Sequence, residues 1–315
     1  MKITVLDANT LGEDIDVSRI SSVGEITVYD FTTAQQVAER IKDSDVVVLN
    51  KVKLNEENLS NAHNLKLVCV TATGYDNIDT AYCGTRGIQV SNIVGYSTNS
   101  VAQVTVATVL ELATHIREFN GYVTSGDYTK NGVANKVTPA FRELNGKTWG
   151  IIGLGNIGKK VAAIAEAFGC KVLAFKRTPD ENYSCTDLEA LCKSSDIISI
   201  HTPLTEYTRG LIGERELNMM KPSVILYNAA RGAVTDEKAV ADALLTNKIG
   251  AFGCDVYSTE PFPIDHPMQK IANLPNVCLT PHMAWASYEA RNLCIDEVIE
   301  NIRAFKNGTA RNKVN

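Results

Sequence analysis

Short runs of β-branched and other apolar residues alternate along this chain with longer segments in which apolar residues recur at helical spacing. The alternation predicts parallel strands connected by helices. It occurs in two series, the second beginning near Trp149. The first series contains KITVLD, EITVYD, DVVVLN, LKLVCVT and IQVSN, and the second contains TWGIIG, KVLAF, DIISIH, SVILYN, GAFGCDV and NVCLTP. We therefore expect an α/β protein with two doubly wound parallel sheets.

Two long helical patterns indicate where the domains divide. Residues 99–122 are apolar around much of the helical circumference and predict one buried helix that crosses between domains. Residues 285–308 form an amphipathic pattern that ends at a glycine, a common signal for a helix C-terminus. If this last helix returns to the first domain, the domains are residues 1–98 with 288–315, for the substrate, and residues 99–287, for a dinucleotide.

Composition narrows the class of partner. The formal net charge of −5 gives no basic footprint for nucleic acid or for an anionic membrane, which favours a small-molecule partner. The eight cysteines are scattered without a C-x-x-C pair, so we expect reduced thiols and no metal site. Without a leader or a long apolar segment, the predicted location is the cytoplasm.

A glycine-rich turn follows the first strand of the second series. The motif GLGNIG runs from a predicted strand directly into a predicted helix. Glycines at these positions allow a tight turn, let the backbone approach a diphosphate and let the helix pack against the strand. A tight β-to-α turn without a ligand is the alternative. The context favours a dinucleotide, bound by Gly153, Gly155, Asn156, Ile157 and Gly158.

The next strand ends in VLAFKRTP, where dinucleotide-binding folds usually place an acidic residue for the adenosine ribose. Lys176 lies eighteen residues after Gly158 and is followed by Arg177. Two cations suit a 2′-phosphate, which a carboxylate would repel. The pattern favours NADP(H) over NAD(H). In the alternative, both residues are a solvated strand end and NAD(H) is bound through other groups.

Arg231, Asp255, Glu260 and His282 each come shortly after a predicted strand. Because the carboxyl ends of parallel strands line the ligand crevice of a doubly wound sheet, we expect these side chains to converge there. Each has an ordinary alternative: a solvated arginine, a loop carboxylate or a histidine that caps a helix. Their order along the chain is more specific than any one of them.

The whole chain resembles the D-isomer-specific 2-hydroxyacid dehydrogenases, most closely their glycerate dehydrogenase or hydroxypyruvate (glyoxylate) reductase branch. The motifs that carry this resemblance are GLGNIG, ATGYDNID, NSVAQ, HTPLTEYTRGLI, NAARGAVTDE, CDVYSTEP and TPHMAWAS. The resemblance implies a flavodoxin-like substrate domain and a Rossmann domain. It also implies reversible NAD(P)H-dependent reduction of a small 2-oxo acid, such as hydroxypyruvate or glyoxylate, to D-glycerate or glycolate.

The resemblance also implies roles for individual residues. Arg231 would bind the substrate carboxylate and carbonyl, His282 would donate the proton, and Glu260 would orient His282. The remaining positions contact the cofactor (Thr202, Pro203, Ala229 and Asp255) or the substrate (Thr73, Gly74 and Trp285). Trp285 is equally suited to a core or a subunit interface.

Two other functions stay open on the sequence alone. A broader dehydrogenase of branched or aromatic 2-oxo acids would use the same chemistry with a larger pocket. A dinucleotide-sensing corepressor scaffold would use the same fold without turnover. The resemblance further implies a homodimer, with residues 100–119 and 126–139 as candidate interface segments.

Overall fold

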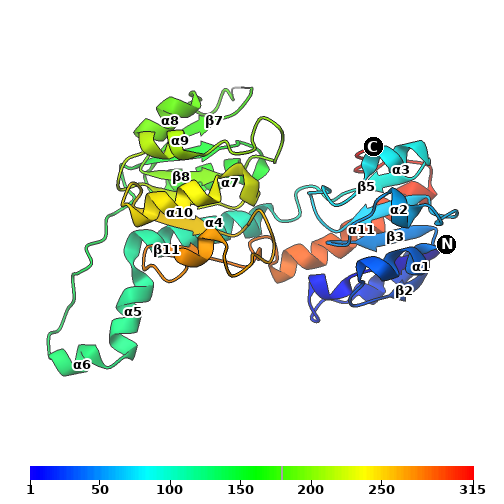
Figure 1. Cartoon of the computed structure of the whole chain (residues 1–315), viewed down its shortest axis with the longest axis horizontal. Coiled ribbons are helices and arrows are strands. Elements are labelled where there is room, and N and C mark those ends of the chain that lie inside the picture. Colours follow the sequence, from blue (N-terminus) through cyan, green and yellow to red (C-terminus); the bar gives the residue numbers. More distant parts are fainter. Residues whose placement is uncertain (179) are drawn as a thin grey trace. The chain divides into compact units, whose positions relative to one another are not determined.

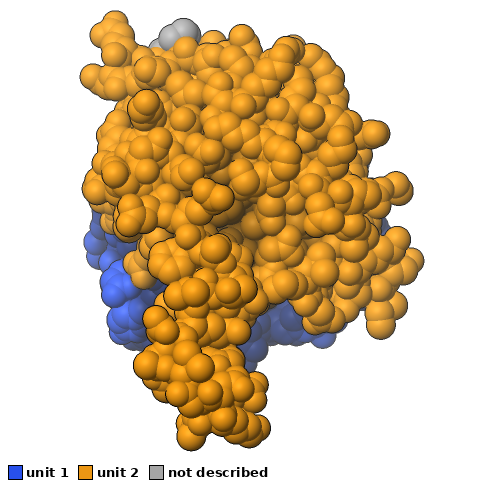
Figure 2. Space-filling model, turned by 90° about the vertical axis from the view of Figure 1, so that its left-hand side faces the viewer, with its two compact units in different colours: residues 1–97, 286–315 blue, residues 98–285 orange. Residues whose placement is uncertain are grey.

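The computed structural model describes residues 1–178 and 180–315, which form two compact units. Unit 1 comprises Met1–Ser97 and Ala286–Asn315, and unit 2 comprises Thr98–Trp285 (Figures 1 and 2). Both units contain a wholly parallel sheet with helices, so the predicted fold class is confirmed.

Unit 1 has a five-stranded sheet in the order β2-β1-β3-β4-β5, the flavodoxin-like arrangement. Its strands are β1 (Lys2–Val5), β2 (Glu25–Val28), β3 (Val46–Leu49), β4 (Leu67–Val70) and β5 (Gln89–Ser91). Its α-helices are α1 (Val37–Ile41), α2 (Glu56–Leu59), α3 (Thr80–Thr85) and α11 (Tyr288–Lys306), and its 3-10 helices are η1 (Ala8–Leu11), η2 (Val17–Val23) and η3 (Ala34–Gln36). All residues of β3 and β4 are buried, which accounts for their continuous apolar sequences.

The last helix, α11, belongs to unit 1 although 188 residues of unit 2 precede it in the chain. Its side chains Ile295, Val298 and Ile302 are buried. Arg291 at its start binds Asp14 with an N–O distance of 2.5 Å. The expected amphipathic helix is therefore present, and it closes the core of unit 1.

Unit 2 has a six-stranded sheet in the order β11-β10-β9-β8-β6-β7. Its strands are β6 (Thr148–Ile152), β7 (Lys171–Phe175), β8 (Ile197–Ile200), β9 (Ile225–Asn228), β10 (Ala251–Cys254) and β11 (Val277–Leu279). Its helices are α4 (Thr98–Thr114), α5 (Ile116–Thr124), α6 (Asp127–Asn131), α7 (Asn156–Ala167), α8 (Leu188–Ser194), α9 (Glu214–Met219) and α10 (Glu237–Leu245), with 3-10 turns η4 (Gly232–Val234) and η5 (Pro267–Lys270). The strand order reverses between β6 and β8, and ligands bind at such a point in doubly wound sheets.

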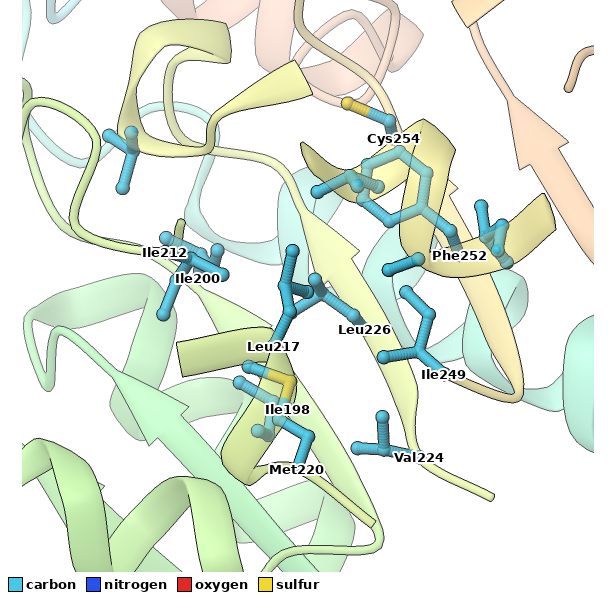
Figure 3. Packing of buried hydrophobic residues seen from close by; sticks show 14 of the residues in the cluster. Ile198, Ile200, Ile212, Leu217, Met220, Val224, Leu226, Ile249, Phe252 and Cys254 are labelled. Atoms are coloured by element: carbon cyan, nitrogen blue, oxygen red, sulfur yellow. The ribbon is translucent and has the colours of Figure 1, made fainter. Parts of the chain in front are cut away.

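The core of unit 2 lies on both faces of this sheet. On one face, strand side chains such as Ile198, Leu226 and Phe252 pack with residues from the helices and loops that cover them (Figure 3). On the other face, Trp149 is fully buried and its indole N–H donates to Ser199 Oγ at 2.9 Å. The sheet is thus held on both sides, and its loops start from fixed strand ends.

The single helix predicted over residues 99–122 is wrong, because the structure breaks it at His115. This residue has a φ of 54°, a left-handed conformation that interrupts the helix between α4 and α5. Eight residues of α4 are buried, whereas every residue of α5 is described and none of them is buried. The segment after α4 extends from the body of unit 2 as an arm of α5 and α6 (Figure 1). Among the described residues, no helix is long and apolar enough to cross a membrane.

Candidate active site

The glycine loop lies at the carboxyl end of β6, where the strand order of unit 2 reverses. Gly153 has a φ of 94°, and a Cβ on it would lie 2.6 Å from the backbone nitrogen of Thr202. A Cβ on Gly158 would overlap the carbonyl oxygen of Gly153. Helix α7 begins at Asn156, directly after the loop, so its free N–H groups are available at this edge. The loop therefore has the tight backbone and the helix end that a diphosphate requires.

The neighbouring strand end, after β8, carries Thr202, which is partly exposed, and Pro203, which is exposed. Between β8 and Thr202 lies His201. Although the residue as a whole is partly exposed, both ring nitrogens are buried, and neither has a hydrogen-bond partner among the described residues. Burial lowers the pKa of His201 to about 3, so the ring is neutral at physiological pH.

We call the residues around the end of β7, where the adenosine ribose is expected, the ribose end of the site. The surroundings of Lys176 there differ from the sequence-based expectation of two free cations. Lys176 Nζ lies 3.5 Å from Asp180 Oδ2, and Lys159 Nζ on α7 lies 2.7 Å from the same oxygen. The hydrogen bond from Lys159 lowers the pKa of Asp180 to about 2, with a smaller contribution from the backbone N–H of Asn182. Arg177, the next residue, is exposed. The Asp180 carboxylate thus faces two lysines, and these three groups together keep a positive charge.

Arg231 is held at the end of β9 by a buried asparagine. Asn228, the last residue of β9, is fully buried; its side-chain oxygen accepts from Ala230 N at 3.0 Å and its Nδ2 donates to Arg231 O at 3.0 Å. This side chain takes the place of backbone partners in the turn. The Arg231 guanidinium donates to Ala230 O at 2.8 Å and is itself partly exposed.

His282 and Glu260 form a direct pair at the ends of β11 and β10. The distance between His282 Nδ1 and Glu260 Oε2 is 2.6 Å, and the side chains are 24% and 30% exposed. The other carboxylate oxygen of Glu260 accepts from Tyr257 N at 2.9 Å. His282 has a φ of 54°, a conformation that non-glycine residues adopt at a cost and that clusters at functional sites. The pairing leaves Nε2 of His282 as the nitrogen available to a substrate.

Asp255 supports the backbone that follows His282. The residue is 1% exposed, and its carboxylate accepts from Thr280 Oγ1 at 2.6 Å, Met283 N at 2.9 Å and Ala284 N at 2.9 Å. Burial raises the pKa of Asp255, and these hydrogen bonds together with His282 oppose the rise. The contact of Asp255 with a nicotinamide stays a prediction.

For four other predicted site residues, the structure gives the unit to which each belongs but does not test their roles. Thr73 and Gly74 belong to unit 1, where Thr73 Oγ1 donates to Ile93 O at 2.8 Å and Asn92 Nδ2 donates to Thr73 O at 2.8 Å. Ala229 and Trp285 belong to unit 2 and are partly buried. Within the described residues, no three His, Cys, Asp or Glu side chains are grouped as metal ligands.

Comparison with known proteins agrees with this geometry. Residues 106–284 match the model of the NAD binding domain of D-isomer specific 2-hydroxyacid dehydrogenases. The chain belongs to this family. It is 38% identical to the glycerate dehydrogenase of Methylorubrum extorquens, covering 99% of this chain and 98% of that protein. It is 37% identical to the hydroxypyruvate reductase of Blautia hydrogenotrophica, covering 100% of both.

Solved structures of this dehydrogenase fold give the same result. An acyclic imino acid reductase in complex with NADPH and D-arginine has a TM-score of 0.88 at 30% identity, covering 100% of both chains. The D-lactate dehydrogenase of Aquifex aeolicus, complexed with NAD and lactic acid, has a TM-score of 0.86 at 30% identity, covering 98% of this chain and 96% of that one. The protein is thus an oxidoreductase of the 2-hydroxyacid dehydrogenase family with a nicotinamide-cofactor domain.

Sequence reasoning missed several residues that shape this dehydrogenase site. Asn228 stands inside the quoted motif NAARGAVTDE, and a polar residue ending an otherwise apolar strand was the available signal. Lys159 and Asp180 carried no signal, because their contact joins a helix face to a residue twenty-one positions later. Glu237 and His266 were likewise invisible as a pair, since 29 positions separate them.

Proposed function

We propose that this protein reduces hydroxypyruvate or glyoxylate to D-glycerate or glycolate, reversibly, with a reduced nicotinamide cofactor. The observation that carries the proposal is the 2.6 Å pair of His282 and Glu260, beside the strand end that bears Arg231. A glycerate dehydrogenase, a hydroxypyruvate reductase and a glyoxylate reductase of Thermococcus litoralis, the last 38% identical over 86% of this chain and 83% of that protein, support this substrate class.

The residues of the site divide the work of carbonyl reduction. The guanidinium of Arg231 binds the carboxylate of the 2-oxo acid and polarises its carbonyl. In its imidazolium form, His282 pairs with the Glu260 carboxylate through Nδ1 and donates its Nε2 proton to the oxygen as charge develops there, which leaves a neutral imidazole. The bound cofactor supplies the hydride. In the reverse direction, His282 accepts the proton of the hydroxyl group.

Substrate binding also involves residues of unit 1 in this proposal. The backbone amides of Thr73 and Gly74 bind the substrate carboxylate, and Trp285 limits the size of the substrate tail. A dehydrogenase acting on branched or aromatic 2-oxo acids would need more room beside Trp285. The corepressor-like alternative is disfavoured because Arg231, Glu260 and His282 are all present and the last two are paired directly.

For the cofactor, we infer a preference for NADP(H). The support is the pair of lysines around Asp180, Lys159 and Lys176, together with the exposed Arg177 that follows Lys176 in the chain. Asp180 weakens this support, since it already engages the two lysines, but Arg177 stays available for a 2′-phosphate.

Initial rates with NADPH and NADH, measured in parallel on hydroxypyruvate, glyoxylate, pyruvate and phenylpyruvate, test both inferences. A higher kcat/KM with NADPH and with hydroxypyruvate or glyoxylate is expected. A higher kcat/KM with NADH contradicts the cofactor inference alone. Activity confined to phenylpyruvate contradicts the small-substrate inference. Binding of dinucleotide without turnover of any of these substrates contradicts the proposed reductase activity.

We also propose a homodimer that forms through the α5–α6 arm of unit 2. Of the two candidate segments, residues 126–139, which include α6, offer more free surface than residues 100–119, because the inner face of α4 is part of the core of unit 2. Ile116 at the start of α5 is 62% exposed, Val137 six residues after α6 is 75% exposed, and the arm protrudes from unit 2 (Figure 2). Sedimentation at micromolar concentration should give twice the chain mass, and Val137→Asp should shift it towards the monomer. A monomeric wild type contradicts the dimer.

The cytoplasmic location likewise stays a prediction.

A further inference from the structure

We propose, on the basis of the reductase function proposed above, that Glu237 is a positioning residue that holds the loop bearing Glu260. The loop runs from Tyr257 to His266 and follows β10. Glu237 is the first residue of α10 and is 9% exposed. It does not cap its own helix, because the neighbouring Asp236 accepts from Lys238 N and Ala239 N at 3.0 Å each. Its carboxylate is therefore directed to another part of the chain.

That carboxylate ties both ends of the loop. Oε1 of Glu237 accepts from Ser258 N at 2.8 Å, and Oε2 accepts from the Ser258 hydroxyl and lies 3.1 Å from Nε2 of His266. Ser258 and His266 stand on either side of Glu260 in the sequence. One buried carboxylate thus fixes the two points between which Glu260 is carried.

The hydrogen bonds determine the state of His266. Its Nδ1 accepts from Met268 N at 3.3 Å, so this nitrogen carries no proton. The proton is then on Nε2, which donates to Glu237. A neutral imidazole in this tautomer and an ionised Glu237 give every polar atom of the cluster a partner, as buried polar groups require.

The inside of the loop is filled by aromatic rings that connect it to the other strand ends. Phe262 stacks on His266 with ring centroids 5.0 Å apart and meets Tyr257 edge-on at 4.7 Å. The Tyr257 hydroxyl donates to Thr280 O at 3.0 Å, two residues before His282.

On the opposite side, the loop lies directly against the residue after Arg231. A Cβ on Gly232 would overlap the backbone of Tyr257 and Ser258, so only glycine permits this approach. The loop therefore touches the neighbours of Arg231 and His282 and carries Glu260 between them. Displacing it by a fraction of an ångström would misalign Glu260 with His282 while leaving the glycine loop unchanged.

Glu237→Gln tests this role in the full-length protein. The amide keeps the shape but replaces an accepting oxygen with a donor, which opposes the donors of Ser258 or His266. We expect kcat for the 2-oxo acid to fall by about 10²-fold, the loss typical of a small misplacement of a catalytic group. The KM for the substrate and the Kd for the cofactor, measured by fluorescence, should change by at most about twofold.

Asp196→Asn is the matched control. Asp196 also accepts a backbone N–H, from Thr148 at 2.9 Å, and binds Lys221 Nζ at 2.9 Å. It directly precedes β8, however, and so lies at the amino ends of the strands, away from the carboxyl ends that carry the candidate site. It should lower Tm without lowering kcat at a temperature where the protein is folded. An equal fall of kcat in both variants overturns the proposal, because Glu237 would then act only on stability.

A second pair of variants covers the case in which Glu237→Gln does not fold. Ser258→Ala removes one donor to Glu237 and should lower kcat severalfold, whereas Ser258→Thr keeps the hydroxyl and should restore it. If Ser258→Ala keeps full kcat, or if a folded Glu237→Gln does, the positioning role is wrong. The underlying function fails separately: it fails if the wild type itself reduces no 2-oxo acid, or if His282→Ala stays active.

Discussion

The two ends of the candidate site in unit 2 are held in place by different means. At the catalytic end, the carboxylates of Asp255 and Glu237 are buried, and each accepts three hydrogen bonds from the loops that carry His282 and Glu260. At the ribose end, Asp180 forms ion pairs with Lys159 and Lys176, whose side chains are 47% and 25% exposed.

This difference teaches what a substitution at each end should change. Buried hydrogen bonds fix positions to a fraction of an ångström, so losses at the catalytic end should appear as slower chemistry. Partly exposed charges attract over several ångströms and are screened by salt, so changes at the ribose end should alter selectivity. The predictions below test this division.

The largest effect is expected for His282→Ala. Without the proton donor, kcat for reduction should fall by about 10²- to 10⁴-fold. The cofactor Kd should stay within about twofold of wild type, because the glycine loop and the ribose cluster are untouched. Stopped-flow rates and fluorescence titration measure the two quantities. A kcat near the wild-type value would mean that the pair with Glu260 does not carry the proton.

A smaller effect is expected for Lys176→Asp. The new carboxylate would stand beside Asp180 and repel a 2′-phosphate, so the ratio of kcat/KM for NADPH to that for NADH should fall about tenfold. Asp180→Asn should raise the same ratio, since it frees both lysines, and raising the ionic strength should reduce both effects.

Lys238→Asp is the control for these two substitutions. Lys238 pairs with Asp242 at 2.7 Å on α10, an exposed ion pair of the same kind away from the ribose end. It should leave the cofactor ratio unchanged. If Lys176→Asp leaves it unchanged as well, the cations after β7 are a solvated strand end, and the ribose is recognised elsewhere.

The smallest effect is expected for His201, which lies between the two ends. Its pKa is about 3 in the folded chain and near the ordinary value when unfolded, so between these values the unfolded chain binds one proton more. The free energy of unfolding should therefore fall as the pH falls below about 6.5, by up to about 1.4 kcal/mol per pH unit from this group. Urea unfolding at several pH values should show a shallower fall for His201→Gln. Parallel pH curves for the two proteins would mean that the ring is solvated.

Most of the fold could be predicted from local sequence patterns. Each of the eleven apolar runs contains a strand of the structure. In interior strands such as β3, β4 and β8 every residue is buried, and a strand buried on both faces must be continuously apolar over its short length. The glycine loop was visible for a similar reason, since its requirements are met within six consecutive residues. The break at His115 was not visible, because neither glycine nor proline marks it.

The residues of the candidate site were predictable from the sequence only where their positions directly after predicted strands marked them. Arg231, Glu260 and His282 follow strands whose ends meet, and the structure pairs two of them directly. The partners that hold them come from distant positions: Glu237 reaches Ser258 across 21 residues, and Asp255 reaches Met283 across 28. Contacts of this range depend on how loops fold back, which no periodicity records. The pairing of Lys176 with Asp180 was missed because it depends on side-chain direction.

The division of unit 1 into two stretches of chain sets the order in which the protein can be completed during synthesis. Residues 98–285 are contiguous, so all of unit 2 is present once this stretch has left the ribosome. Unit 1 begins first but lacks α11, whose side chains Ile295, Val298 and Ile302 close its core, until the last thirty residues emerge. Its apolar surface stays uncovered while unit 2 folds, the reverse of the usual progression from the N-terminal domain. An uncovered apolar surface of this kind exposes the incomplete chain to aggregation until α11 is in place.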